Sequence, residues 1–243
     1  MPKSNSIYRA LNRSLGKALH AYGMIQDGDR IAVGLSGGKD SWALLYLLSE
    51  RLTRIPVKYT LFPIHIDLGF DRSASDIIRE HAQSMGWTVR VEYTDFGVVA
   101  HSDVNRENPC FLCARRRRQR LFEVADELGC TKLALGHNKD DLIETLFINI
   151  FYAGELSTMM PRQPFFNGRL TVIRPLAYAN EEDLIRFSRQ MAWPIVTNPC
   201  PSAGHSRRGE VKEILQGLYR DNCKVKGNIF NAMRNIRSEY LLK

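Results

Sequence analysis

Two spacings of apolar residues alternate along the 243-residue chain. Near the N-terminus, apolar positions recur every four residues, at Ile7, Leu11, Leu15 and Leu19, and predict an amphipathic basic helix. Further on, short apolar runs predict strands at 30–35, 59–68, 88–93 and 132–135, and helical patterns cover 41–51, 73–85, 111–128 and 140–152. Strands that alternate with helices indicate βαβ units. We therefore expect an α/β fold, an open parallel β-sheet of Rossmann-like type with helices on both faces.

The last third of the chain has a less regular pattern. Residues 154–169 are rich in Gly, Pro and Met and are expected to form a long loop, whereas 181–191, 208–219 and 226–241 have helical patterns. We therefore divide the sequence into three parts. These are a basic N-terminal helix (1–28), an α/β domain (29–198) and a small helical C-terminal extension with a basic tail (199–243).

The net charge of the chain indicates one class of binding partner. The formal net charge is +8 and the isoelectric point is about 9.4, which favours a polyanionic partner such as nucleic acid. No run approaches the roughly 20 consecutive apolar residues of a membrane span, and the N-terminus lacks the apolar core of a signal peptide. We therefore expect a cytoplasmic location without a membrane partner. The five cysteines are an odd number, which does not indicate a disulfide framework in such a chain.

The stretch SGGKDS, residues 36–41, follows the first predicted strand and opens the next helix. Ligands of open α/β sheets bind beyond the carboxyl ends of the strands, at such a turn. The two glycines let backbone amides approach an anion, the helix adds its positive N-terminal dipole, and Lys39 adds a cation. The abutting glycines distinguish the stretch from the G-x-x-x-x-G-K-[ST] loop. It predicts a phosphate site, and the alternative is a glycine turn with Asp40 or Ser41 as the helix cap.

This stretch resembles the pyrophosphate-binding loop of the PP-loop ATP pyrophosphatases. Members of that family cleave ATP between its α- and β-phosphates and adenylate a carbonyl oxygen, after which a nucleophile displaces AMP. The resemblance implies a PP-loop ATPase domain over 29–198, with Lys39 and Asp140 in catalysis. The residues that it implies for ATP binding are Ser36, Gly37, Gly38, Lys39, Asp40, Ser41, Asp67 in HIDLG, and Gly136, His137 and Asp141 in LALGHNKDDLIETLF. Asp140 and Asp141 suit Mg²⁺, which prefers carboxylate oxygens, and capping of the following helix is their alternative role.

Three of the five cysteines form a candidate metal site. Cys110 and Cys113 make a C-x-x-C at the start of a helix, and Cys200 follows in the sequence NPCPSAGHS. Three thiolates can hold a [4Fe-4S] cluster and leave one iron open to a further ligand such as hydrosulfide. Structural zinc on the three cysteines and His205 is an alternative, which spacing alone favours. A catalytic persulfide on one cysteine is another.

Together, the loop and the cysteines resemble the tRNA 2-thiocytidine biosynthesis proteins, PP-loop enzymes with an oxygen-sensitive [4Fe-4S] cluster on three cysteines. The resemblance runs from about Arg9 to Ser238 and includes GHNKDDLIETLFINIFYAGEL and VIRPLAY. It implies that Cys110, Cys113 and Cys200 hold the cluster and take part in catalysis. It further implies an ATP-dependent transferase that adenylates O2 of a tRNA cytidine and replaces it with sulfur from a cysteine desulfurase or sulfide. A homodimer is compatible with the sequence.

Three other functions stay open. The first is a tRNA 2-thiouridine synthetase. The chain lacks the terminal C-x-x-C zinc modules of those related enzymes, but PCPSAGHS stands where a second C-x-x-C is expected, so the target base stays open. A PP-loop amidating or ligating enzyme with structural zinc needs no catalytic cysteines. A zinc-stabilised RNA-binding module carries out no catalysis.

Four further features remain. Two are expected to be structural, and each of the other two has two interpretations. Cys130 precedes a predicted strand and His65 lies inside one, so both are expected in the core. The arginines at 115–118 and 120 surround their helix, either as a solvated surface or as contacts to tRNA phosphates. Arg174 in IRPLAY either faces the site or braces a loop.

Overall fold

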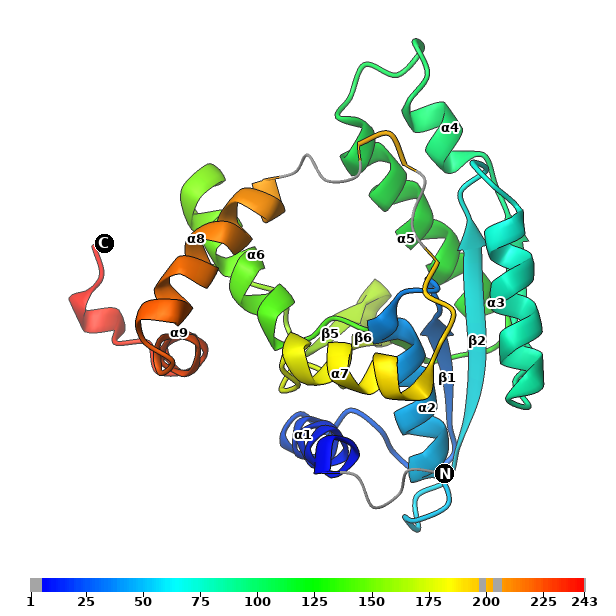
Figure 1. Cartoon of the computed structure of the whole chain (residues 1–243), viewed down its shortest axis with the longest axis horizontal. Helices are drawn as coiled ribbons and strands as arrows, with labels where there is room; N and C mark the ends of the chain where they lie inside the picture. Colours follow the sequence, from blue (N-terminus) through cyan, green and yellow to red (C-terminus); the bar gives the residue numbers. More distant parts are fainter. Residues whose placement is uncertain (1–5, 197–199, 203–206, 243) are drawn as a thin grey trace. The chain divides into compact units, whose positions relative to one another are not determined.

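The computed structural model of the protein describes residues 6–196, 200–202 and 207–242, and Figure 1 labels most of its elements. The helices are α1 (Ser6–Ala21), α2 (Lys39–Arg51), α3 (Ser73–Ser84), α4 (Phe96–Ala100), α5 (Pro109–Glu127), α6 (Lys139–Tyr152), α7 (Glu181–Met191), α8 (Arg207–Asp221) and α9 (Val225–Ala232), with short 3-10 turns η1 (Phe166–Gly168) and η2 (Ser238–Tyr240). The strands are β1 (Asp29–Gly34), β2 (Tyr59–Asp67), β3 (Arg90–Tyr93), β4 (Lys132–Ala134), β5 (Arg162–Phe165) and β6 (Leu170–Ile173).

The strands form one six-stranded sheet in the order β3-β2-β1-β4-β6-β5. The pairs β1–β2, β2–β3, β1–β4 and β4–β6 are parallel, and β5 alone among them runs antiparallel, against β6. This arrangement confirms the predicted α/β class with a mostly parallel sheet. Since parallel strands share a carboxyl edge, the residues that follow β1, β4 and β6 lie along one edge of the sheet.

Helices cover both faces of the sheet, as predicted. Successive residues of a strand point to opposite faces. Accordingly, Ile31 and Val33 of β1 belong to a core with α1, α2 and α7, while Ala32 belongs to a second core with α5. A strand buried on both faces reads as a continuous apolar run, which explains why β1 was recognisable in the sequence.

The chain divides into two compact units. The first comprises Met1–Asn138 and Met160–Ala203 and contains the whole sheet, and the second comprises Lys139–Met159 and Gly204–Lys243 and contains α6, α8 and α9. The sequence held no signal that α6 groups with the C-terminal helices. The three-part division at 28/29 and 198/199 stays a prediction.

Two expectations about the last third of the chain are wrong. Residues 154–169 do not form one long loop, because β5 lies within them and pairs with β6 from Arg162 opposite Ile173 to Phe165 opposite Leu170. The strand is short and carries Pro164, so its pairing rather than its local pattern defines it. The helix expected over 226–241 ends at Ala232, since the apolar side chains beyond it, such as Ile236, are exposed and gain nothing from a continued helix.

The structure also contains elements that the sequence did not indicate. The helix α4 has only five residues and β6 only four, too few to set a clear period. Within the described ranges, none of the helices combines the length and the apolar character that crossing a membrane requires.

Candidate functional site

The loop of residues 36–41 joins β1 to α2 and has a tightly constrained backbone. Gly37 has a φ of +79°, and a Cβ there would lie 2.7 Å from Ile78 Cδ1. Only glycine fits this position without strain. The Ser41 hydroxyl holds the loop together, since it accepts from the Ser36 amide at 3.2 Å and donates to the Gly38 carbonyl at 2.9 Å.

The N-terminus of α2 is open to an anion. Gly38 is its N-cap, and none of the described side chains makes a capping hydrogen bond there. The alternative in which Asp40 or Ser41 caps the helix is therefore wrong. The first-turn amides have no acceptor within the helix, and together with the helix dipole they favour a phosphate.

Lys39 is held at this loop by two carboxylates. Its Nζ lies 3.1 Å from Asp40 Oδ2 and 3.1 Å from Glu181 Oε1, at the first residue of α7. Burial lowers the pKa of Lys39, but the two carboxylates outweigh burial and the pKa is raised. Lys39 is therefore a firmly charged cation. Glu181 was missed from the sequence because nothing local connects it to the loop.

Gly136 brings the turn after β4 against the phosphate loop. A Cβ at Gly136 would lie 3.1 Å from the carbonyl carbon of Asp40 and 3.1 Å from the amide nitrogen of Ser41. Both neighbours are backbone atoms at the start of α2, so they cannot move aside easily. The prediction that Gly136 belongs to the site is supported by this contact, although its role in ATP binding stays a prediction.

His137 and Arg174 meet at the same edge of the sheet. Arg174 directly follows β6, is 7% exposed, and donates from Nε to His137 Nδ1 at 3.3 Å. Its Nη1 donates to the Met160 carbonyl. Burial, and secondly Arg118, lower the pKa of Arg174 to about 10. Arg174 therefore contacts both His137 and the Met160 segment, so facing the site and bracing a loop both stay predictions.

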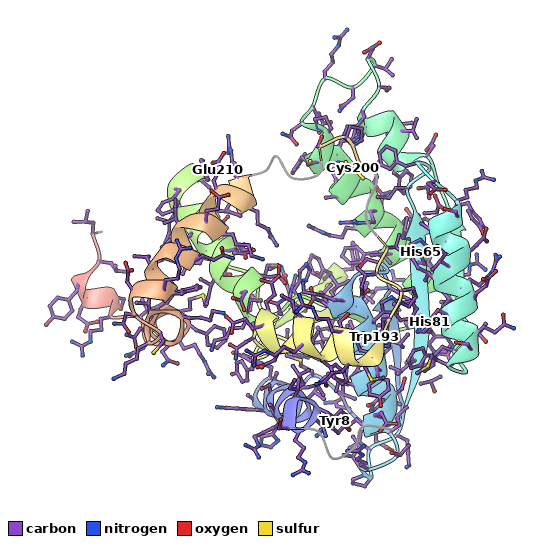
Figure 2. The ribbon with its side chains drawn as sticks, in the orientation of Figure 1. Tyr8, His65, His81, Trp193, Cys200 and Glu210 are labelled. Atoms are coloured by element: carbon purple, nitrogen blue, oxygen red, sulfur yellow. The ribbon has the colours of Figure 1, made fainter. Side chains whose placement is uncertain are left out.

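Asp67 and His65 lie at the end of β2, where Figure 2 labels His65. Both are buried, as predicted for His65. The Gly69 amide donates to Asp67 Oδ1 at 2.7 Å and the Ser75 hydroxyl donates to Oδ2, so both carboxylate oxygens are engaged within the chain. His65 Nδ1 donates to the Leu35 carbonyl at 2.8 Å and ties β2 to the residue before the loop. The expected contact of Asp67 with adenosine stays a prediction.

The three cysteines gather at the N-terminal end of α5, beside which Figure 2 labels Cys200. The Asn108 side chain caps this helix by accepting from the Phe111 amide at 3.2 Å, which places Cys110 and Cys113 in its first turn. The pKa of the Cys113 thiol is raised, chiefly by burial, while Arg117 lowers it and Cys200 and Cys110 raise it. Cys113 is therefore within electrostatic range of both other cysteines.

The three thiols suit an iron–sulfur cluster with one open iron, and the zinc alternative stays open. His205, the fourth ligand of that alternative, lies outside the described residues. Among residues 6–196, 200–202 and 207–242, no three His, Cys, Asp or Glu side chains are arranged so that they could hold a metal ion. The cysteines thus match the cluster in residue type, while their ligand role stays a prediction.

His101 is a neighbour of Cys200 that the sequence did not reveal. Its Nδ1 donates to the Gly97 carbonyl at 2.9 Å, and its Nε2 lies 2.8 Å from Ser202 Oγ and 3.4 Å from Cys200 Sγ. The two residues are 99 positions apart, so no spacing rule links them. His101 orients the segment that carries the third cysteine.

The second unit contains the two aspartates that open α6. Lys226 Nζ lies 2.6 Å from Asp140 Oδ1, and Arg208 Nη1 lies 2.8 Å from Asp141 Oδ1. Burial raises the pKa of Tyr219, and the charges of Asp140 and Glu144 raise it further. Any Mg²⁺ at these carboxylates must compete with the lysine and the arginine, and the magnesium site stays a prediction.

The arginine run of α5 has two kinds of member. Arg120 pairs with Glu92, Glu123 and Glu127, and Arg115 pairs with Glu107, so these two belong to the solvated surface. The charges of Arg117 and Arg118 act instead on Cys113 and on Arg174. Cys130 is buried in the core beneath α5, as predicted, and burial raises its pKa to about 11.

The fold and the loop define the class of protein. A mostly parallel α/β sheet with a glycine-constrained, uncapped phosphate loop after β1 is a nucleotide-binding architecture. A family described as a PP-loop domain matches residues 7–212. The NH₃-dependent NAD synthetase of Campylobacter jejuni, 11% identical, shares the fold with a TM-score of 0.51 over 96% of this chain and 93% of its own.

Relatives narrow the class. The tRNA-cytidine(32) 2-sulfurtransferase of Geotalea daltonii is 42% identical over 98% of this chain and 96% of its own length. That of Geobacter sulfurreducens is 41% identical over 98% and 94%. The chain belongs to the PP-loop family, among the tRNA-cytidine(32) 2-sulfurtransferases. The U34-tRNA thiolase NcsA of Methanococcus maripaludis, solved with its [4Fe-4S] cluster, is 25% identical with a TM-score of 0.79 over 97% of this chain and 80% of its own.

Proposed function

We propose that the protein is an ATP-dependent tRNA sulfurtransferase that replaces O2 of a tRNA cytidine with sulfur and so forms 2-thiocytidine. The observation that carries the proposal is the presence, in one compact unit, of an uncapped phosphate loop and a group of three cysteines. The names of the relatives supply the base, cytidine 32.

The first half of the reaction activates the base. ATP binds with its phosphates on loop 36–41, and O2 of the cytosine attacks the α-phosphorus. A bond forms between O2 and phosphorus, the bond to the β-phosphate oxygen breaks, and pyrophosphate leaves. Lys39 and the amides at the start of α2 stabilise the negative charge that grows on the phosphates. The oxygen, a poor leaving group, has become part of an AMP ester.

The second half exchanges oxygen for sulfur. A sulfur nucleophile forms a bond to C2, the bond between C2 and the adenylated oxygen breaks, and AMP leaves. Cys110, Cys113 and Cys200 would hold a [4Fe-4S] cluster, which when bound supplies an iron with a position open to sulfur. Asp140 and Asp141 would hold Mg²⁺. A cysteine desulfurase or sulfide as the sulfur donor, a homodimer and a cytoplasmic location remain predictions of this proposal.

The test begins with protein purified without oxygen. A brown protein with about four irons and four sulfides per chain is expected, and it should form 2-thiocytidine in unmodified tRNA only when ATP and sulfide are supplied. A colourless protein with about one zinc and no thiolated tRNA would overturn the proposal in favour of a structural Cys/His site. Formation of 2-thiouridine instead would establish the second candidate, which the likeness to the U34-tRNA thiolase favours.

A further inference from the structure

Arg174 is a buried charge without an acidic partner. Its side chain is 7% exposed, and the atoms to which it donates are His137 Nδ1 and the Met160 carbonyl oxygen. Among the described residues, no Asp or Glu acts on its charge. Within that part of the chain, the charge that does act on it is Arg118, a second cation.

An arrangement of this kind is unfavourable for the protein by itself. A buried charge is normally neutralised by a counter-ion, because leaving it unpaired in a medium of low dielectric is costly. Burial and Arg118 together lower the pKa of Arg174 to about 10, which still leaves the guanidinium charged at neutral pH. An anion brought in as a ligand would supply the missing countercharge.

The position of Arg174 fits a substrate rather than a structural ion. Arg174 follows β6 and loop 36–41 follows β1, and β4 alone separates these two strands in the sheet. Two strand spacings are roughly 10 Å, so Arg174 lies along the same ligand-binding edge as the loop, with its backbone displaced from the loop by about that distance.

His137 adds a hydrogen-bond donor to this position. Its Nδ1 accepts from Arg174 Nε at 3.3 Å, so the ring proton is on Nε2 and Nε2 is a donor. Arg118, on the exposed side of α5, adds a second positive charge. Guanidinium groups bind phosphate oxygens in pairs of hydrogen bonds, and together these three side chains suit a phosphate more than a carboxylate or a neutral ligand.

We propose that Arg174, His137 and Arg118 form a second phosphate-binding site, separate from loop 36–41, for one phosphate group of the reaction's substrates. The inference rests on the proposed function. Two sources share this chemistry: the α-phosphate of ATP, which is retained in AMP, and a backbone phosphate of the RNA. The competing interpretation is that Arg174 only fixes the Met160 segment to His137, in which case no ligand depends on its charge.

Binding measurements on the full chain test the site. Arg174→Met removes the charge and keeps the length of the side chain, and Arg174→Lys keeps the charge without the paired donors. Arg169→Met is the matched control, because Arg169 is an exposed arginine whose partner is Asp126 on the surface. The probes are AMP, inorganic pyrophosphate, and an unmodified anticodon stem-loop RNA titrated at several salt concentrations.

Each outcome decides the inference. If the site holds the α-phosphate, Arg174→Met weakens AMP binding roughly tenfold or more and leaves pyrophosphate binding unchanged. If it holds an RNA phosphate, AMP binding is unchanged, RNA binding weakens, and the slope of log K against log salt falls by about 1. Arg174→Lys lies between wild type and Arg174→Met in either case. Unchanged affinity for both AMP and RNA in Arg174→Met overturns the proposal.

Two further comparisons keep the test decisive. If Arg174→Met does not fold, Arg118→Met replaces it, since Arg118 is on the surface. Its affinity for the same ligand should fall two- to fivefold. An unchanged affinity in Arg118→Met would then count against the site. Because Cys200→Ala should abolish sulfur transfer while AMP and RNA still bind, failure of the proposed function and failure of this site give different results.

Discussion

Lys39 of the phosphate loop and Glu181 of α7 are 142 residues apart in sequence, yet Lys39 Nζ and Glu181 Oε1 lie 3.1 Å apart. Glu181 and Asp40 both pair with the lysine. We therefore predict that a triphosphate bound at the loop exchanges these carboxylates for its own oxygens. On this prediction, the affinity for nucleotide depends on that exchange and not on Lys39 alone.

Glu181→Gln should tighten ATP binding three- to tenfold, because it removes a negative charge that competes with phosphate for Lys39. Isothermal titration with ATP at fixed salt measures the effect. Glu182→Gln, a change at the exposed neighbouring glutamate, is the control and should alter affinity less than twofold. Weaker ATP binding in Glu181→Gln would mean that Glu181 positions Lys39 productively instead of competing for it.

Lys39→Ala should lower kcat/KM for tRNA thiolation by a hundredfold or more, since a cation directed at developing phosphate charge contributes that much in comparable sites. Lys39→Arg should not restore activity fully, because the planar guanidinium does not fit the place of a compact ammonium. The visible spectrum and the iron content should remain those of wild type. Full activity in Lys39→Ala would contradict the phosphate role of the loop.

Gly136→Ala should weaken ATP binding and lower stability by roughly 1–3 kcal/mol, because the new methyl group would press on the backbone of Asp40 at 3.1 Å. Urea unfolding and ATP titration measure the two effects. Gly217→Ala in α8 is the control, since nothing lies within 4 Å of the added Cβ, and it should leave stability equal or slightly raised.

Cys110→Ala, Cys113→Ala and Cys200→Ala should each abolish thiolation and lower the iron content, as removal of one of three protein ligands should destabilise the cluster. Iron and sulfide analysis of protein purified without oxygen measures this. Cys223→Ser is the control at an exposed cysteine and should keep both iron and activity. Retention of full iron in any of the three variants would remove that cysteine from the ligand set.

The stability of the protein should fall as the pH drops below about 6.5, the ordinary pKa of histidine. Burial lowers the pKa of His65, against smaller opposing effects of the Leu35 carbonyl and Asp67, and burial also lowers the pKa of His81. The unfolded chain then takes up protons that the folded chain does not hold, so acid favours unfolding. Urea unfolding at pH 7.5 and pH 5.5 measures the loss, which His65→Gln should reduce. Equal stability of the wild type at both pH values would contradict this prediction.

The sequence was most informative for elements whose bounds depend on neighbouring residues alone. The α7 helix begins and ends at the predicted residues because its apolar stripe and its acidic first turn are local signals. The β2 strand was expected despite Pro63. The structure shows why the strand tolerates a proline, which has no N–H to donate: Pro63 comes just before the residues that pair with β3. The strand β5 had no such local signal and depends on its partner β6.

The site was predictable only in part, for a related reason. The phosphate loop and the C-x-x-C are contiguous motifs, so their residue types and spacing can be read directly. Glu181, His101 and the buried state of Arg174 come from contacts across the fold, and one sequence without those contacts gives no spacing to interpret. Arg174 is one such case, because its contacts with His137 and with the Met160 carbonyl become visible only in the fold.

The segment before the third cysteine is hydrogen-bonded to the phosphate loop. The Val196 amide donates to the Gly37 carbonyl at 3.2 Å, and Trp42 Nε1 donates to the Pro194 carbonyl at 3.2 Å. Cys200 comes four residues after Val196, and four residues reach at most about 14 Å when fully extended. The covalent chain thus keeps Cys200 within about 14 Å of Val196, and we expect it to limit the distance between the proposed phosphate site and the proposed sulfur site.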